Sequence, residues 1–402
     1  MTAFQSESDT SNYEQTKQAI SRLPALDWMR GFVMILMAID HGGILNGDHF
    51  IADSWTTYVT GSLPSAPQFY TRWITHLCAP TFLFLSGVSL SIALERRHAA
   101  GQSERQLDRY LLTRGLILLL LEILWLGPLF LQVLYAIGFS MILMCGLRRL
   151  STTTLLVISG AILLGSEAAV SLAITWSGQA PADLALALSG ERWAGWFLAV
   201  TPFLHPGKFA GTPLDILYPV LPWLAMMILG WVFGRRILSP SNVKNAERTP
   251  ETVLLVSGIA LLVIFVLVRG LNDYGNMFIL RESNALISWL HVSKYPPSLS
   301  FVALEMGLMS ICLWALFLLQ RRSTVLQGTR NPIVVFGQTA LMFYVVHLTI
   351  LGVLPFALGI QGSGGLIGQY SAALIVLIGL YPFCLWYRKY KSAHPQKWVR
   401  FI

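Results

Sequence analysis

Ten apolar runs, each near the length needed to cross a lipid bilayer, constrain this chain more than any other feature. A membrane-spanning helix needs about 20 mostly apolar residues. The runs cover approximately residues 26–45, 73–94, 113–129, 130–147, 152–175, 214–234, 252–269, 298–320, 332–355 and 366–387. The sequence therefore predicts an all-α, polytopic transmembrane helix bundle of about ten helices, with the lipid bilayer as its main partner.

The charged residues agree with a membrane protein and argue against a soluble one. Only 12% of the 402 residues are charged, against about 25% in an average soluble domain. The net charge of +8 does not indicate a nucleic-acid partner, because Lys and Arg lie in short clusters between the apolar runs. Cytoplasmic loops collect Lys and Arg, and most of these residues fall in such loops if both termini are cytoplasmic, which is the predicted topology.

The predicted organisation is a polar cytoplasmic segment (1–24), one transmembrane domain (25–390) and a basic cytoplasmic tail (391–402). The apolar and aromatic stretch 193–204 is the one ambiguity. It is short and followed by His-Pro-Gly-Lys, so it is predicted to be interfacial or re-entrant. Counting it as an eleventh span would place Arg235 and Arg236 outside, so ten spans are preferred. The sequence leaves the oligomeric state open between a monomer and a homo-oligomer.

Ionisable residues inside the apolar runs are candidate functional residues, because each costs roughly 2.5–3.5 kcal/mol to insert. The first run carries four of them. Asp27 and Arg30 are three residues apart at its cytoplasmic end, where they can pair. Asp40 and His41 follow near its outer end. Adjacent residues point about 100° apart on a helix, so these two are expected to face different neighbours, and a structural pair remains an alternative to a catalytic one.

Further candidates lie in or next to three other runs. Arg72 and His76 are four apart and share a helical face. Lys294 and Tyr295 precede two prolines that define the start of the next span, where an ammonium is suited to a phosphate or carboxylate. His347 lies well inside the ninth run, either as a buried histidine bonded to another helix or in one polar cluster with His41 and His76.

Other patterns point to packing rather than chemistry. The four cysteines each lie alone in an apolar stretch with no histidine at metal-ligand spacing, so no metal is expected. Gly230 and Gly234 form a GxxxG motif that is typical of close helix packing. Walker, HExxH, GxSxG and dinucleotide-binding motifs are absent from the sequence. The sequence therefore lacks the motifs that usually indicate a hydrolase or a nucleotide-driven pump.

Five motifs together resemble a known family. In chain order they are LDWMRGFVMILMAIDHGG, TRWITHLCAPTFLFLSGVSL, LYPVLPWLAMMILGWVFGRR, SKYPPSLSF and FGQTALMFYVVHL. They resemble the bacterial DUF1624 membrane proteins, which are similar to the catalytic region of heparan-alpha-glucosaminide N-acetyltransferase. The resemblance runs from about residue 22 to 390. One departure is that the lysosomal enzyme has an asparagine at the end of its first helix where this chain has Asp40-His41. A later loop histidine of that enzyme has only His49 as a loose counterpart.

The resemblance implies a bacterial inner-membrane enzyme that takes an acetyl group from cytoplasmic acetyl-CoA and delivers it to a sugar amine or hydroxyl outside. It places Asp40, His41, Arg72 and His76 in the functional region. A histidine suits the general base such a reaction needs, with His41 preferred over His76. Arg72 or Lys294 could stabilise charge, with Tyr295 and His347 beside them in substrate binding. Asp27 and Arg30 could hold the donor phosphates.

Two other classes of function explain part of the same pattern. In a proton-coupled transporter or a lipid or glycan flippase, the intramembrane Asp, His and Arg would form a proton or substrate path. No inverted repeat supports this alternative. A non-catalytic membrane scaffold explains the helices but gives the outer polar residues no purpose. Binding of acetyl-CoA would distinguish the enzyme from both.

Overall fold

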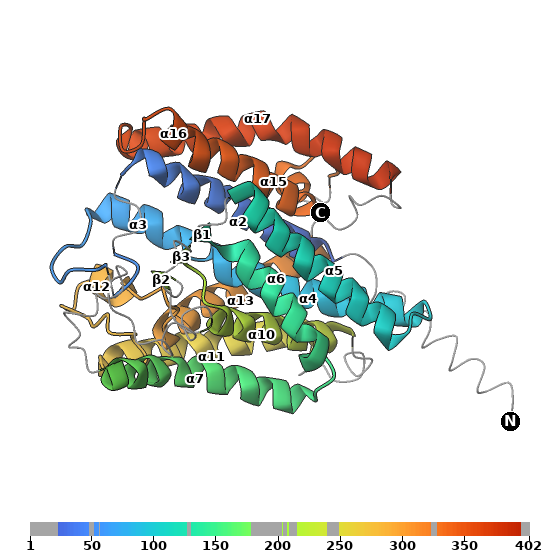
Figure 1. Cartoon of the computed structure of the whole chain (residues 1–402), viewed down its shortest axis with the longest axis horizontal. Helices are drawn as coiled ribbons and strands as arrows, with labels where there is room; N and C mark the ends of the chain where they lie inside the picture. Colours follow the sequence, from blue (N-terminus) through green and yellow to red (C-terminus); the bar gives the residue numbers. More distant parts are fainter. Residues whose placement is uncertain are drawn as a thin grey trace, which may run out of the picture.

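The computed structural model describes residues 23–47, 52–55, 57–126, 130–177, 203, 207–208, 215–238, 249–322 and 328–394. The helices run side by side along the long axis of the molecule (Figure 1). In chain order the elements are α2 (Pro24–Gly42), η1 (Gly43–Leu45), α3 (Ala66–Thr75), α4 (Cys78–Ala99), α5 (Glu104–Leu121), η2 (Glu122–Leu126), β1 (Phe130–Leu131), α6 (Val133–Leu147), α7 (Thr152–Ser177), β2 (Gly207–Lys208), β3 (Asp215–Ile216), α10 (Val220–Leu238), α11 (Pro250–Leu271), α12 (Leu286–Leu290), α13 (Leu299–Arg322), α14 (Pro332–Gln338), α15 (Ala340–Leu348), η6 (Thr349–Val353), α16 (Leu354–Ala357) and α17 (Gly365–Ala393).

The all-helical membrane bundle predicted from the sequence is confirmed. Within the described residues, 8 helical segments are long and apolar enough to cross a membrane. The two other predicted spans are also helical, as α5 and α6. They fall short because α5 begins with a charged turn that includes Glu104, Arg105 and Asp108, and because α6 has only 15 residues. The ambiguous stretch 193–204 lies, except for Phe203, outside the described residues.

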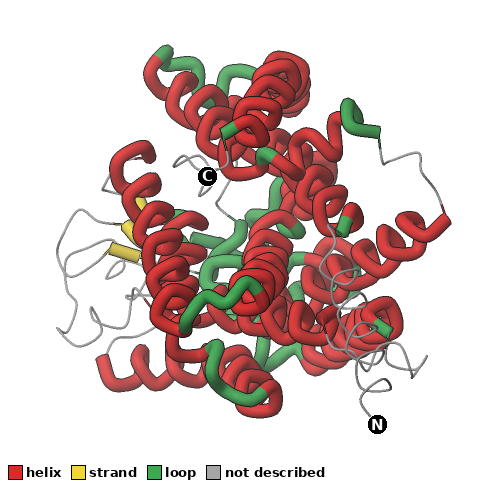
Figure 2. The backbone as a smooth tube through the Cα atoms, turned by 90° about the vertical axis from the view of Figure 1, so that its right-hand side faces the viewer, coloured by secondary structure: helices red, strands yellow, loops and turns green. Residues whose placement is uncertain are grey.

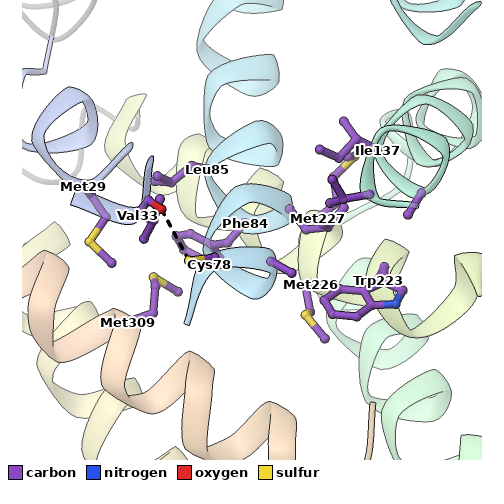
Figure 3. Close-up of a cluster of buried hydrophobic side chains, with 14 of the residues drawn as sticks. Met29, Val33, Cys78, Phe84, Leu85, Ile137, Trp223, Met226, Met227 and Met309 are labelled. Carbon is purple, nitrogen blue, oxygen red and sulfur yellow. Dashed lines mark hydrogen bonds between the residues drawn. The ribbon is translucent and has the colours of Figure 1, made fainter. Parts of the chain in front are cut away.

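The apolar core is centred on α4. Figure 3 shows Phe84 and Leu85 of this helix with Met29 and Val33 of α2, Met227 of α10 and other side chains of α6 and α13 around them. The Cys78 thiol lies 3.4 Å from the Val33 carbonyl oxygen. All four cysteines are free. Cys78 and Cys384 are buried, as expected for packing residues, whereas Cys145 and Cys312 are only partly buried.

Glycines let pairs of helices approach until their backbones touch. A Cβ on Gly230 of α10 would lie 2.0 Å from the Phe84 carbonyl oxygen of α4, and a Cβ on Gly87 of α4 would lie 2.0 Å from the Met227 carbonyl oxygen. The Gly230–Gly234 motif therefore packs α10 against α4, as predicted. A glycine also allows close contact between α2 and α14, because a Cβ on Gly31 would lie 1.8 Å from the Ile333 carbonyl oxygen.

The two ends of the bundle differ. At one end, α3 and α12 lie against each other, and α16 lies at the same end in Figure 1. Three short strands lie to one side of the bundle (Figure 2), with β1 parallel and β2 antiparallel to β3. Because Asp215 and Ile216 pair in β3, α10 begins at Val220 rather than at the predicted residue 214. The basic ends of α4, α6 and α10 meet at the other end of the bundle.

Candidate active site

A buried arginine joins two carboxylates at the end of the bundle where α2 ends. One terminal nitrogen of Arg72 in α3 donates a hydrogen bond to Asp40. The other terminal nitrogen and Nε both donate to Asp53, and the bond from Nε is 2.7 Å long. Thr75 donates a further hydrogen bond to Asp40. All these side chains are buried. Charge-assisted bonds on both sides of a planar guanidinium fix its orientation, so this triad ties α2, α3 and the loop before α3 together.

Asp53 comes from a loop that the segment before α13 holds in place. The backbone nitrogens of Lys294 and Tyr295 donate to the Asp53 carbonyl oxygen over 2.9 and 3.2 Å. His291 Nε2 lies 2.6 Å from the Ala52 carbonyl oxygen. Burial by itself would raise the pKa of the Asp53 carboxyl, but Arg72 and the other positive groups beside it hold that pKa well below its usual range. Asp53 is therefore an ionised carboxylate at neutral pH.

His76 shares the carboxylate of Asp53 with Arg72. Its Nε2 lies 3.2 Å from Asp53 Oδ1, while its Nδ1 is buried and has no hydrogen-bond partner among the described residues. A carboxylate that accepts from one ring nitrogen orients a histidine and leaves the other nitrogen as the basic one. The predicted neighbours Arg72 and His76 thus meet through Asp53.

His41 points away from this triad and pairs with His347, so the expectation that Asp40 and His41 face different neighbours is confirmed. His41 Nδ1 lies 2.8 Å from His347 Nε2, and His347 Nδ1 lies 2.8 Å from the Phe343 carbonyl oxygen. Because a carbonyl oxygen only accepts, Nδ1 of His347 carries a hydrogen. In the neutral pair, Nε2 of His347 therefore accepts from His41, and the lone pair of His41 resides on its Nε2.

An inner cavity of about 320 Å³ begins among charged side chains. Arg30, Arg114 and Lys391 line it, together with Asp27. Arg30 donates to Asp27 over 2.8 Å, which confirms the predicted pair, and also bonds Ser89 of α4. Arg114 bonds Tyr110 over 3.0 Å, but its buried Nε has no partner among the described residues. These cations make this part of the cavity suited to an anionic ligand.

The rest of the inner cavity is mostly apolar and leads to Tyr344. Its walls include Met34, Leu118, Val133 and Ile137. Tyr344 of α15 is the lining residue that contacts the histidine pair, because its ring lies edge-on to His41 and to His347 with centroids 6.3 and 5.8 Å apart. The cavity therefore reaches the neighbourhood of the histidine pair, although neither histidine is part of its lining.

A second, smaller pocket, named the outer pocket below, lies beside the triad. Asp53, Arg72 and His76 line it, with a ring of further polar and aromatic residues: Asn46, Gln68, Thr71, Trp73, His291 and Gln369. Its volume of about 30 Å³ has room for about two water molecules. Amide, hydroxyl and indole groups of this kind suit a single hydroxyl or amine group of a sugar, which is as much as a pocket of this volume takes.

Lys294 and Tyr295 lie behind this pocket rather than in its lining. Lys294 is 2% exposed, and its ammonium nitrogen lies 5.2 Å from the centre of the Tyr295 ring. The Tyr295 hydroxyl lies 3.3 Å from the hydroxyl of Tyr218. The two residues position Asp53 through their backbone nitrogens. Their predicted role as substrate-binding side chains stays a prediction.

Sequence reasoning overlooked four residues of this region. Glu122 and Glu305 are buried ionisable residues in apolar segments, so the rule that singled out Asp40 applies to them equally. Tyr344 precedes His347 by one turn of helix and shares its face. Asp53 carries no sequence signal, because it lies in an irregular loop. His49, the loose counterpart, is outside the described residues. The described residues contain no group of three or more His, Cys, Asp or Glu side chains placed to hold a metal ion.

One comparison with known proteins is decisive. The family of the heparan-alpha-glucosaminide N-acetyltransferase catalytic region matches residues 22–270. The chain belongs to this family. No curated protein matches it. The match to the N-acetyltransferase family confirms the resemblance read from the motifs, and it covers the chain from α2 to α11. Asp40, His41, Arg72 and His76 lie inside the matched range, whereas Lys294, Tyr344 and His347 lie beyond it.

Proposed function

We propose that the chain is a membrane acetyltransferase that passes the acetyl group of cytoplasmic acetyl-CoA to a sugar amine or hydroxyl on the far side of the membrane. Membership of the N-acetyltransferase family supports the reaction class. The observation that carries the proposal is the set of contacts around the end of α2. His41 contacts Tyr344, which lines the inner cavity, and it follows Asp40, which is paired with Arg72 of the outer pocket.

The inner cavity suits the donor. Its cationic part, with Arg30, Arg114 and Lys391, would bind the phosphates of CoA. Its apolar part would take the pantetheine arm and bring the thioester to Tyr344 and the histidine pair. The orientation that this requires, with both termini cytoplasmic, is supported by the basic residues near the ends of α4, α6 and α10, which lie together at one end of the bundle.

The chemistry proposed for His41 is general-base catalysis. Its Nε2 takes a proton from the acceptor nitrogen or oxygen as that atom attacks the thioester carbonyl carbon. A C–N or C–O bond forms and the C–S bond breaks. The proton then passes to the sulfur, so that the acetylated sugar and the free thiol of CoA leave. His76, oriented by Asp53, would bind one hydroxyl or amine group of the acceptor in the outer pocket.

The experiment that tests the function uses the full-length protein in lipid nanodiscs. Binding of acetyl-CoA is measured by calorimetry, with free CoA as a comparison ligand. Transfer of the labelled acetyl group is measured in proteoliposomes that are loaded with one of a panel of amino sugars as the acceptor. Wild-type protein should bind acetyl-CoA saturably and acetylate at least one acceptor. The His41→Ala variant should keep donor binding and lose transfer by about 10²–10⁴-fold.

A matched control is His98→Ala, since His98 lies at the end of α4 and lines neither the inner cavity nor the outer pocket. It should behave as wild type in both assays. Absence of acetyl-CoA binding in folded wild-type protein would overturn the proposal and favour a transporter. Loss of donor binding in His41→Ala would assign His41 a structural role instead.

A further inference from the structure

The hydroxyl of Tyr344 is a buried polar group in the lining of the inner cavity. Tyr344 is 5% exposed, and its hydroxyl oxygen is buried with no hydrogen-bond partner among the described residues. A buried polar group left unpaired lowers stability, and the membrane interior offers no bulk water to offset that loss. A group that binds in the cavity beside Tyr344 would satisfy this hydroxyl.

Much of the cavity lining offers no hydrogen-bond donor to a ligand. Its apolar walls include Val133, Leu134 and Ile137. The hydroxyl of Thr339, which also lines the cavity, already donates to the Val335 carbonyl oxygen over 2.8 Å. Tyr344 is thus well placed to be the polar contact for a ligand atom that reaches this part of the cavity.

The ring of Tyr344 is held beside the base. Its edge-on contacts with His41 and His347 set it against the nitrogen pair. The neighbouring Phe343 stacks on His347 with centroids 4.9 Å apart and on Phe336 at the same distance. These contacts restrict rotation of the Tyr344 and Phe343 side chains. The Tyr344 hydroxyl is therefore already in position before a ligand binds.

We propose that the Tyr344 hydroxyl donates a hydrogen bond to the carbonyl oxygen of the donor thioester and is a catalytic residue of the transfer. The inference rests on the proposed function. When the acceptor attacks the carbonyl carbon, the C=O electron pair moves to the oxygen, and the hydrogen bond strengthens as that charge develops. When this electron pair re-forms the C=O bond, the C–S bond breaks and the thiolate takes the proton held by His41. Tyr344 itself loses no proton.

The test replaces the hydroxyl and keeps the ring. Tyr344→Phe should lower kcat by about 10²-fold, in line with the loss of one oxyanion donor, while the Kd for acetyl-CoA changes far less. Tyr387→Phe is the matched control, since Tyr387 also has a buried hydroxyl without a partner among the described residues but lies outside the cavity lining. It should keep wild-type kcat and Kd.

A spectroscopic measurement separates catalysis from folding. The carbonyl stretch of ¹³C-labelled acetyl-CoA should shift to lower wavenumber on binding to wild type and return toward the free value in Tyr344→Phe. An unshifted stretch in wild type would overturn the inference even if the variant failed to fold. So would full kcat in Tyr344→Phe. Failure of wild type to bind acetyl-CoA would instead count against the proposed function itself.

Discussion

His41 and His347, which are 306 positions apart in the sequence, form a hydrogen bond of 2.8 Å between Nδ1 of the first and Nε2 of the second. The carbonyl oxygen of Phe343 fixes the hydrogen of His347 on its other nitrogen. The pair therefore determines which nitrogen of His41 carries the lone pair. In the proposed reaction, His347 would take the orienting role that a carboxylate takes in many enzymes.

Replacing His347 tests this relationship. His347→Ala should lower kcat by about 10²-fold, because His41 would lose the acceptor that fixes its tautomer, and donor binding should be retained. Steady-state transfer rates and calorimetric Kd values check both statements. His394→Ala, at the end of α17 and outside both cavities, is the control. Unchanged kcat in His347→Ala would mean that the pair is only structural.

The arginine between Asp40 and Asp53 should be essential for stability. Arg72→Met would leave two carboxylates buried without their shared cation, and loss of one partner of a buried ion pair costs about 3–5 kcal/mol. Chemical unfolding in mild detergent should show a loss of this size. Arg72→Lys should recover only part of it, because an ammonium lacks the planar fork that reaches both carboxylates. Arg322→Met, at the exposed end of α13, should change stability by less than about 0.5 kcal/mol.

Arg114 should control affinity for the nucleotide part of the donor. Arg114→Gln removes a cation with an unpartnered Nε from the cavity lining, and a hydrogen bond to a charged group contributes about 1.5–3 kcal/mol. The Kd for acetyl-CoA should therefore rise at least tenfold, while that for S-acetylpantetheine, which lacks the nucleotide, should not change. Arg149→Gln, which is paired with Asp108 outside this cavity, is the control. Equal effects on both ligands would place the phosphates elsewhere.

Close contact between α4 and α10 should make Gly230 intolerant of any side chain. Gly230→Ala would put a Cβ 2.0 Å from the Phe84 carbonyl oxygen, so the helices must separate, at a cost of about 1–3 kcal/mol. Gly160→Ala, on α7 with nothing within 4 Å of the new Cβ, should stabilise the protein by up to about 1 kcal/mol. Unfolding midpoints of the two variants should therefore move in opposite directions.

Acid should destabilise the protein partly through His291. Burial lowers the pKa of His291, and its hydrogen bond to the Ala52 carbonyl oxygen offsets this only in part. Below the unfolded pKa of about 6.5, the unfolded chain therefore takes up a proton that the folded protein resists. The contribution of His291 to stability is complete above that pH and declines as pH falls toward its folded pKa.

The measurement is the unfolding midpoint between pH 8 and 5 for wild type and His291→Gln, in which an amide can still donate to Ala52. The variant should lose less stability over this interval than wild type does. His394→Gln, near the C-terminal end of α17, should follow the wild-type curve. A steeper curve for His291→Gln would contradict the assignment.

The sequence by itself determined the bundle. Apolar runs of bilayer length have to form helices, because only internal hydrogen bonds satisfy their backbones in lipid. Each of the ten predicted runs contains a helix, although the fourth and sixth also contain the short strands β1 and β3. Pairs close in sequence were also predictable, since Asp27 and Arg30 meet as their spacing indicates. The motifs were sufficient to identify the family.

Only the tertiary structure decided which residues meet. Asp53 lies in a loop whose place depends on the distant segment 291–295, and local spacing says nothing about such a contact. Helical periodicity indicates that Asp40 and His41 diverge, but it does not name Arg72 and His347 as their partners. Those partners depend on how α2, α3 and α15 pack, because side-chain packing and buried charge pairing act between elements that the chain brings together only on folding.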